Sequence, residues 1–327
     1  MQLLKILKFK FKKGSDIMLY KEWLTIWLEN YVQSTKQRTL TRYTEIIEQH
    51  VKPALGNYDI SEITPYILQR FVTSLLKSGN IRTGGALSPN SVNSIITVLQ
   101  STFKTAHAIG LTSENASNKI IRPKQREKQI ECLSLSEQKS IEAHILSSCK
   151  PKLSGILLCL YTGLRIGELL ALEWTDLDLS RGDIEISKTC YYGKDKNGLF
   201  RRITDSPKTH SSIRTVPLPK QLIPYFRDLK RSSASDYVIS NGKEPISVRS
   251  YQRTFAALLQ KLGISHRGFH ALRHTFATRA LECGMDVKTL SELLGHRSST
   301  VTLNRYVHSM TEHKKAMMNK LGKLLLV

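Results

Sequence analysis

The 327-residue sequence predicts a mainly α-helical protein, with an N-terminal four-helix bundle and a C-terminal, mostly helical domain that carries a small antiparallel β-sheet. Three observations lead to this prediction. Apolar residues recur at helical spacing up to about residue 110 and again after residue 250. A polar, charged and proline-containing stretch lies near residue 130, as is typical of a linker between domains. Short alternating segments, which are typical of strands, occur between residues 183 and 216.

Basic residues dominate the charge of the chain. Lysine and arginine number 49 against 27 aspartate and glutamate residues, which gives a formal net charge of +22. Each phosphate that a cationic side chain neutralises releases counterions, so this excess favours a polyanionic partner such as a nucleic acid. From charge alone, a basic protein without such a partner or a ribosome-associated protein is the alternative.

The cysteines follow neither a disulfide nor a metal-binding spacing, since the five are scattered without a CxxC pair: Cys132, Cys149, Cys159, Cys190 and Cys283. An odd number of cysteines without a secretory leader predicts reduced thiols and a cytoplasmic protein. No stretch reaches the length of a membrane span, so we expect no membrane partner.

Residues 1–19 form a basic extension before the first predicted helix. This segment lacks the long apolar core and the small-residue cleavage site of a signal peptide. Two interpretations stay open. The extension is a short arm that touches DNA, or the start is assigned too early and Met18 is the true initiator.

Four helices are predicted between residues 20 and 122. The first begins at Tyr20, and the second begins at Thr39 or Thr41 and ends near Pro53 and Gly56. The third and fourth begin at Thr64-Pro65 and Ser88-Pro89, where a capping hydroxyl precedes a proline in the first helical position. Helices joined by short connections make a small bundle.

A linker is predicted at residues 123–133, and a second domain at residues 134–327. Ser134 and Glu137 have the spacing of a capping box, which predicts the start of the first helix of this domain. Candidate strands follow at 183–187, 202–204 and 213–216, the last two on either side of a Pro-Lys-Thr turn that contains Lys208. From Tyr251 onward the pattern is helical.

The stretch from Gly268 to His308 holds the residues with the clearest chemistry. His270 and Arg273 are three positions apart on a predicted helix, so they share one side of it, and we expect this pair at the rim of the apolar core. Gly295 predicts a helix end that leaves His296 in a turn, and the next helix carries Tyr306. Cations and hydrogen-bond donors around a phenol suit a phosphodiester substrate.

These motifs occur in a fixed order: TGLRIGELLAL at 162–172, HALRH at 270–274, LLGH at 293–296 and NRYVH at 304–308. Together they resemble the tyrosine recombinase (phage integrase) family. The resemblance implies a SAM-like core-binding, DNA-binding domain at 20–122 and a catalytic domain at 134–327. One departure lies at Asn115-Ala116, where the family often has Asn-Pro.

The resemblance also implies a role for each site residue. Arg165 and Arg273 would hold the nonbridging oxygens of the scissile phosphate, and His270 and His296 would donate hydrogen bonds or transfer protons. Lys208 would protonate the leaving 5′-oxygen, although Lys194, Lys196 and Lys220 compete for this role. The nucleophile would be Tyr306, which forms a 3′-phosphotyrosyl bond on the way to a Holliday junction. No metal and no cofactor are expected.

Each of these residues, considered alone, also has an interpretation without catalysis. A lone arginine such as Arg165 more often forms a salt bridge, and Glu168 is a ready partner. A lone histidine is more often structural. The four-residue spacing of His266, His270 and His274 could indicate a metal, but no HExxH motif accompanies it.

We expect a site-specific recombinase that acts on duplex DNA with paired recombination sites, as a homotetramer, for integration or excision of a mobile element. An excisionase or a DNA-bending protein is a possible accessory partner, and association with the bacterial nucleoid follows. A type IB topoisomerase-like enzyme and a non-catalytic DNA-binding regulator are the alternatives. The sequence leaves open an Xer-like role, and whether the tail after residue 311 docks on its own chain or on a neighbour.

Overall fold

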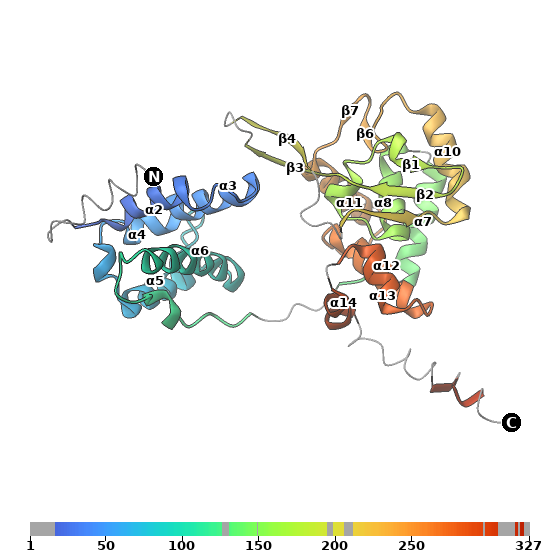
Figure 1. Ribbon diagram of the computed structural model, residues 1–327. Helices are drawn as coiled ribbons and strands as arrows, with labels where there is room; N and C mark the ends of the chain where they lie inside the picture. Colours follow the sequence, from blue (N-terminus) through green and yellow to red (C-terminus); the bar gives the residue numbers. More distant parts are fainter. Residues whose placement is uncertain are drawn as a thin grey trace. The chain divides into compact units, whose positions relative to one another are not determined.

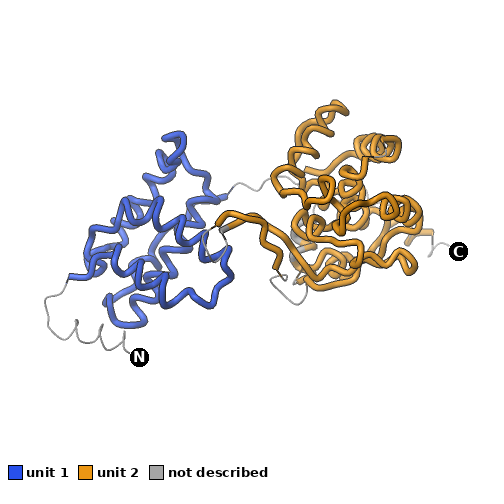
Figure 2. Tube along the Cα trace, turned by 90° about the horizontal axis from the view of Figure 1, so that it is seen from above, with its two compact units in different colours: residues 1–127 blue, residues 128–327 orange. Residues whose placement is uncertain are grey.

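The computed structural model describes residues 17–125, 131–148, 150–194, 199–205, 212–296, 298–306, 318–319 and 321–323 (Figure 1). The chain divides into two compact units, residues 1–127 and 128–327 (Figure 2). Most of the predicted N-terminal extension lies outside the described residues. Among the described residues, none of the helices combines the length and the apolar character that crossing a lipid bilayer requires.

Unit 1 is a helical bundle, as predicted. Its helices are α2 (Tyr20–Asn30), α3 (Gln37–Ile46), α4 (Lys52–Leu55), α5 (Pro65–Ser78) and α6 (Pro89–Ala108). A π-helical turn at Ile47–Val51 joins α3 to α4. The second helix thus begins at Gln37, after an N-cap at Lys36, and not at Thr39 or Thr41. The helical run continues through the π-helical turn and α4 to Leu55, with Gly56 as its C-cap, so the predicted end near Pro53 and Gly56 is confirmed.

The two capping hydroxyls of unit 1 act as the sequence predicts. Thr64 accepts a hydrogen bond from the Ile67 amide at 3.4 Å, and Ser88 accepts one from the Ser91 amide at 3.2 Å. The aromatic residues of α2 are core residues: Trp23 is fully buried, and its indole N–H donates to the Thr102 carbonyl at 3.3 Å.

The predicted linker is anchored at both of its ends. On unit 1, the Ile121 amide donates to Gln69 Oε1 at 2.9 Å, and the Pro123 carbonyl accepts from Asn93 at 3.1 Å. On unit 2, the Leu133 amide donates to Thr275 Oγ1 at 2.9 Å. Residues 121–123 are therefore attached to unit 1, and residue 133 is attached to unit 2.

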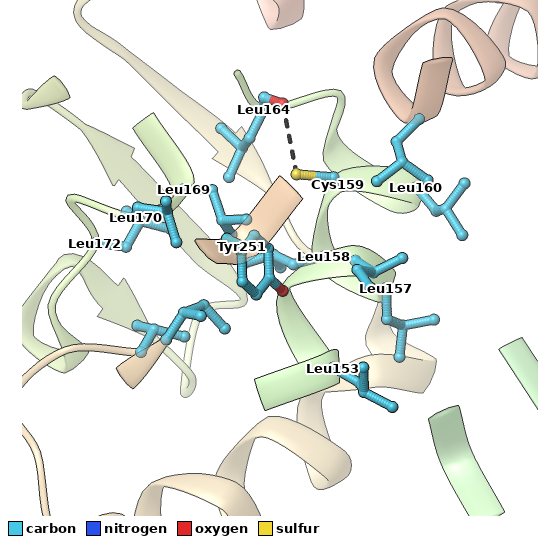
Figure 3. Close-up of a cluster of buried hydrophobic side chains, with 14 of the residues drawn as sticks. Leu153, Leu157, Leu158, Cys159, Leu160, Leu164, Leu169, Leu170, Leu172 and Tyr251 are labelled. Atoms are coloured by element: carbon cyan, nitrogen blue, oxygen red, sulfur yellow. Dashed lines mark hydrogen bonds between the residues drawn. The ribbon is translucent and has the colours of Figure 1, made fainter. Parts of the chain in front are cut away.

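Unit 2 is mostly helical. Its helices are α7 (Leu135–Ser148), α8 (Ser154–Thr162), α9 (Ile166–Leu169), α10 (Ile223–Ser232), α11 (Val248–Lys261), α12 (His270–Glu282), α13 (Val287–Leu294) and α14 (Ser299–Tyr306). The predicted capping box begins α7: the Ser134 amide donates to Glu137 Oε2 at 2.7 Å, and the Glu137 amide donates to Ser134 Oγ at 3.1 Å. Helix α8 lies inside the core, where Leu157, Leu158 and the fully buried Tyr251 meet (Figure 3).

The strands of unit 2 are antiparallel and form separate small sheets. A three-stranded sheet has the order β1 (Leu177–Asp178), β2 (Asp183–Ile186), β5 (Arg214–Pro217), and two hairpins are β3 (Thr189–Lys194) with β4 (Phe200–Asp205) and β6 (Ser240–Asn241) with β7 (Glu244–Pro245). The predicted strands at 202–204 and 213–216 are present in β4 and β5, but they pair with β3 and β2 and not with each other. Pairing β5 with β2 sets Val216 opposite Ile184, so that both apolar side chains reach the core.

Candidate active site

The C-terminal end of α13 is the point where the site residues meet. Gly295 follows this helix with φ of 61°, the left-handed conformation that glycine adopts without strain, so the predicted C-cap is confirmed. The last carbonyls of a helix have no partner within it and carry the negative end of the macrodipole. Three successive carbonyls here each accept a hydrogen bond from a different arginine: Leu293 from Arg214 Nε at 2.6 Å, Leu294 from Arg273 Nη2 at 2.6 Å, and Gly295 from Arg165 Nη2 at 3.2 Å.

Arg165 is held by the turn between α8 and α9. The chain turns at Gly163 with φ of 65°, and a Cβ atom there would lie 2.4 Å from Phe276 Cδ1, so only glycine fits. Leu164 then enters the core, and its carbonyl accepts from the Cys159 thiol at 3.5 Å (Figure 3). Arg165 becomes the N-cap of α9, with 36% of its side chain exposed. A solvent-borne anion can therefore reach its guanidinium.

Glu168 supports this arginine from the first turn of α9. Its Oε1 accepts from Arg165 Nη1 at 2.6 Å, and its Oε2 accepts from the Arg165 amide at 3.0 Å. The same carboxylate pairs with Arg214, whose Nη2 lies 2.9 Å from Oε2. Burial alone would raise the pKa of Glu168, but the hydrogen bonds and charge of Arg214, together with Arg165, outweigh it and hold the pKa below its ordinary value.

Arg214 is a residue that the sequence analysis missed. Only 7% of its side chain is exposed, and it joins β5 to both Glu168 and the end of α13. A signal was present in the sequence. Strand residues two apart face the same side, so Arg214 shares the core side of β5 with Val216, and an arginine on that side needs a buried anion or carbonyls as partners.

Arg273 is buried, with 2% of the residue exposed, and the predicted position at the rim of the core is wrong for it. The reason is that backbone carbonyls inside the core accept hydrogen bonds from its guanidinium. Nη1 donates to the Gly163 carbonyl at 2.8 Å, and Nη2 donates to the Leu294 carbonyl, so the cation sits between the C-terminal ends of α8 and α13. Both macrodipoles favour a positive charge there.

His296 is in contact with Arg273, and His270 is placed differently. The Nε2 atom of His296 lies 2.9 Å from Arg273 Nη2, and its Nδ1 lies 2.8 Å from Thr302 Oγ1. His270 is exposed at the start of α12, where its ring packs edge-on against His274 at a centroid distance of 4.6 Å. Arg165 and Arg273 are thus brought together at the neighbouring carbonyls of Gly295 and Leu294, and Arg273 contacts His296, while the ring contact of His270 is with His274 on α12. Among the described residues, no three His, Cys, Asp or Glu side chains are grouped as a metal site requires.

The predicted nucleophile and general acid are not tested by this geometry. Tyr306 is the last residue of α14, and its side chain lies outside the described part of the chain. Lys208 also lies outside it, as do Lys196 and the side chain of Lys194. Lys220 begins a short 3₁₀ helix at Lys220–Leu222.

Comparisons with known proteins match both parts of the chain. The phage integrase family matches residues 112–313, and the N-terminal SAM-like domain of phage integrases matches residues 19–76. The first match alone covers more than half of the 327 residues. The chain belongs to the phage integrase family. The resemblance inferred from its motifs is thereby confirmed.

Relatives along the whole chain carry recombinase and integrase names. The tyrosine recombinase XerC-like protein of Caldanaerobacter subterraneus is 29% identical, over 92% of this chain and 82% of the relative. The ICEBs1 integrase of Bacillus subtilis is 26% identical over the same shares. This chain is therefore a DNA strand transferase of the tyrosine recombinase type, which acts in site-specific recombination.

Solved structures agree on the fold. The Tn1549 transposon integrase in complex with transposon right end DNA matches with a TM-score of 0.76 at 22% identity, over 93% of this chain and all of the other. A lambda integrase tetramer bound to a Holliday junction matches with a TM-score of 0.65 at 22% identity, over 89% and 82% of the two chains. These likenesses support the predicted pair of domains, a SAM-like bundle and a mostly helical domain with small sheets.

Proposed function

We propose that the chain exchanges strands of duplex DNA through a covalent bond between Tyr306 and a 3′-phosphate. The observation that supports this most directly is the convergence of Arg165, Arg273 and His296 at the end of α13. A guanidinium is a planar fork that matches two phosphate oxygens, and two forks suit the two nonbridging oxygens of a phosphodiester.

Charge stabilisation is the proposed task of the arginines. When Tyr306 attacks, the phosphorus carries five oxygens and extra negative charge, which Arg165 and Arg273 would share. Loss of one preorganised donor costs about 10²–10³ in rate in comparable acyl-transfer sites. Glu168 and Arg214 would act indirectly, since they orient Arg165 and the end of α13.

The proposed reaction balances without an external energy source. The Tyr306 oxygen forms a bond to phosphorus, the bond from phosphorus to the 5′-oxygen breaks, and Lys208 supplies the proton to that 5′-oxygen. His270 or His296 would take up the phenolic proton of Tyr306 during the attack, and the histidine protonated in this way would donate a hydrogen bond to the phosphate. A 5′-hydroxyl of a partner strand then reverses the linkage, which passes through a Holliday junction. One ester replaces another, so no nucleotide cofactor is needed.

Pairs of recombination sites would be held by a homotetramer, in line with the tetramer of the lambda integrase structure. The names of the relatives, which include an integrase and a transposon transposase, support integration or excision of a mobile element as the biological role. An excisionase or DNA-bending protein would fit as an accessory partner, and the enzyme would work in the cytoplasm on nucleoid DNA.

The direct test is covalent trapping on nicked suicide duplexes that carry the sequences flanking the gene. The wild-type chain should form an adduct that survives a denaturing gel, and Tyr306→Phe should form none while it still retards the duplex in a native gel. An undiminished adduct from Tyr306→Phe would remove this residue from the role. Recombination of a two-site plasmid, without relaxation of a plasmid that lacks the sites, would separate this function from a topoisomerase.

A further inference from the structure

Thr302 is a fully buried polar residue on α14, the helix that ends at Tyr306. Its hydroxyl lies 2.8 Å from Nδ1 of His296, in the turn that precedes the helix. Position 306 follows position 302 by about one helical turn. This hydrogen bond links the predicted nucleophile's helix to the group of side chains at the end of α13.

The neighbouring hydrogen bond determines which nitrogen of His296 carries the proton. Arg273 Nη2 lies 2.9 Å from Nε2, and a guanidinium can only donate, so Nε2 must present its lone pair. A neutral imidazole has one N–H, which is then on Nδ1. Nδ1 therefore donates, and the Thr302 hydroxyl accepts.

We propose that Thr302 is a positioning residue for DNA cleavage, an inference that rests on the function proposed above. By accepting from Nδ1, Thr302 keeps His296 in one tautomer, with Nε2 facing Arg273. The same bond holds α14 in register with the phosphate-binding arginines. Valine has nearly the shape of threonine but cannot accept a hydrogen bond, so it would leave the Nδ1 proton without this acceptor. Neither the tautomer of His296 nor the position of α14 would then be fixed by this bond.

The first test compares Thr302→Val with Thr302→Ser in single-turnover cleavage of the nicked duplex. Loss of the acceptor should slow adduct formation by about 10- to 100-fold, because a half-buried donor loses its partner. Serine keeps the hydroxyl and should restore most of the rate, and duplex affinity should stay within about twofold for both variants. Thr300→Val is the matched control, since Thr300 is exposed on the same helix. A wild-type rate for Thr302→Val would overturn the proposal.

The second test asks whether Thr302 acts through His296. In a His296→Ala background, Thr302→Val should have little further effect, because coupled residues are not additive. An equal fold-loss in both backgrounds would assign Thr302 to general folding and would contradict the proposal.

A third test needs no active substrate. Nitrogen-15 NMR of the histidine-labelled chain, with His296→Asn to assign the resonance, should show a protonated Nδ1 and an unprotonated Nε2. The opposite tautomer would contradict the proposal even in an active enzyme. Absence of any adduct from the wild-type chain would instead contradict the proposed function, so the two failures are distinguishable. This measurement also stands if Thr302→Val does not fold.

Discussion

Arg214 and Glu168 form an ion pair with 2.9 Å between Nη2 and Oε2, which joins a residue of the 162–172 motif to an arginine that lies outside all four motifs. Both side chains are nearly inaccessible, at 7% and 4% exposure. The pair joins the small sheet to the turn that carries Arg165. Arg165, which we propose binds phosphate, is therefore supported through the shared Glu168 carboxylate by a second arginine that is nearly buried.

Removal of the Arg214 side chain should destabilise the folded protein. Arg214→Met leaves the Glu168 carboxylate with one cation fewer in a buried site, so the free energy of unfolding should fall by about 3–5 kcal/mol. Urea denaturation measures this change. The double variant with Glu168→Gln should lose much less than the sum of the single losses, because no buried charge remains uncompensated. Additive losses would show that the two side chains do not depend on each other.

Replacement of Arg165 should lower the rate of DNA cleavage without a matching loss of DNA affinity. Arg165→Lys keeps the charge but loses the planar fork, so the single-turnover rate of adduct formation should fall by about 10²–10³ while duplex affinity changes little. Arg181→Lys is a suitable control, since Arg181 is a largely exposed arginine that pairs with Asp183. A loss of affinity that accounts for the whole loss of rate would argue against transition-state stabilisation by Arg165.

Gly163→Ala tests the turn that presents Arg165. The substitution forces a side chain into a left-handed conformation and sets its Cβ 2.4 Å from Phe276, so unfolding should become easier by more than the roughly 1 kcal/mol expected of strain alone. Gly284→Ala is the matched control, because Gly284 has φ of 88° and open space around its Cβ position. Equal losses for the two variants would mean that packing at position 163 adds nothing.

The stabilising effect of Glu168 should depend on pH. Its pKa is lower in the folded chain than the ordinary 4.5, so the ionised form is favoured by folding. The contribution is complete above the unfolded pKa and is lost as the pH falls through the folded pKa. The difference in unfolding free energy between the wild-type chain and Glu168→Gln should therefore be constant near neutral pH and shrink below about pH 4.5. A difference that grows on acidification would contradict this assignment.

Much of the fold is accessible from local sequence signals. The caps at Thr64, Ser88 and Ser134 are local hydrogen bonds between a hydroxyl and nearby amides, so three or four residues suffice to predict them. Gly295 is predictable for the same reason, since the left-handed end of a helix favours glycine. These signals set the helix starts and the turn that holds His296.

The features that were missed depend on contacts between distant parts of the chain. The burial of Arg273 follows from carbonyls at Gly163 and Leu294, 110 and 21 positions away, and a helical pattern cannot reveal them. The pairing of β5 with β2 likewise skips the β3–β4 hairpin between them. A pattern of alternation predicts a strand but not its neighbour.

All three arginines at the end of α13 are held by main-chain oxygen atoms, which every amino acid provides. Positions 293 and 294 are thus free to be chosen for their apolar packing, and the site places no demand on their side chains. The site depends instead on the number of residues in α13, which sets the direction of these oxygens. Inserting or deleting a single residue in this helix would rotate the oxygens by about 100° and disengage all three guanidinium groups at once, whereas a swap of one leucine for another apolar residue would leave them in place.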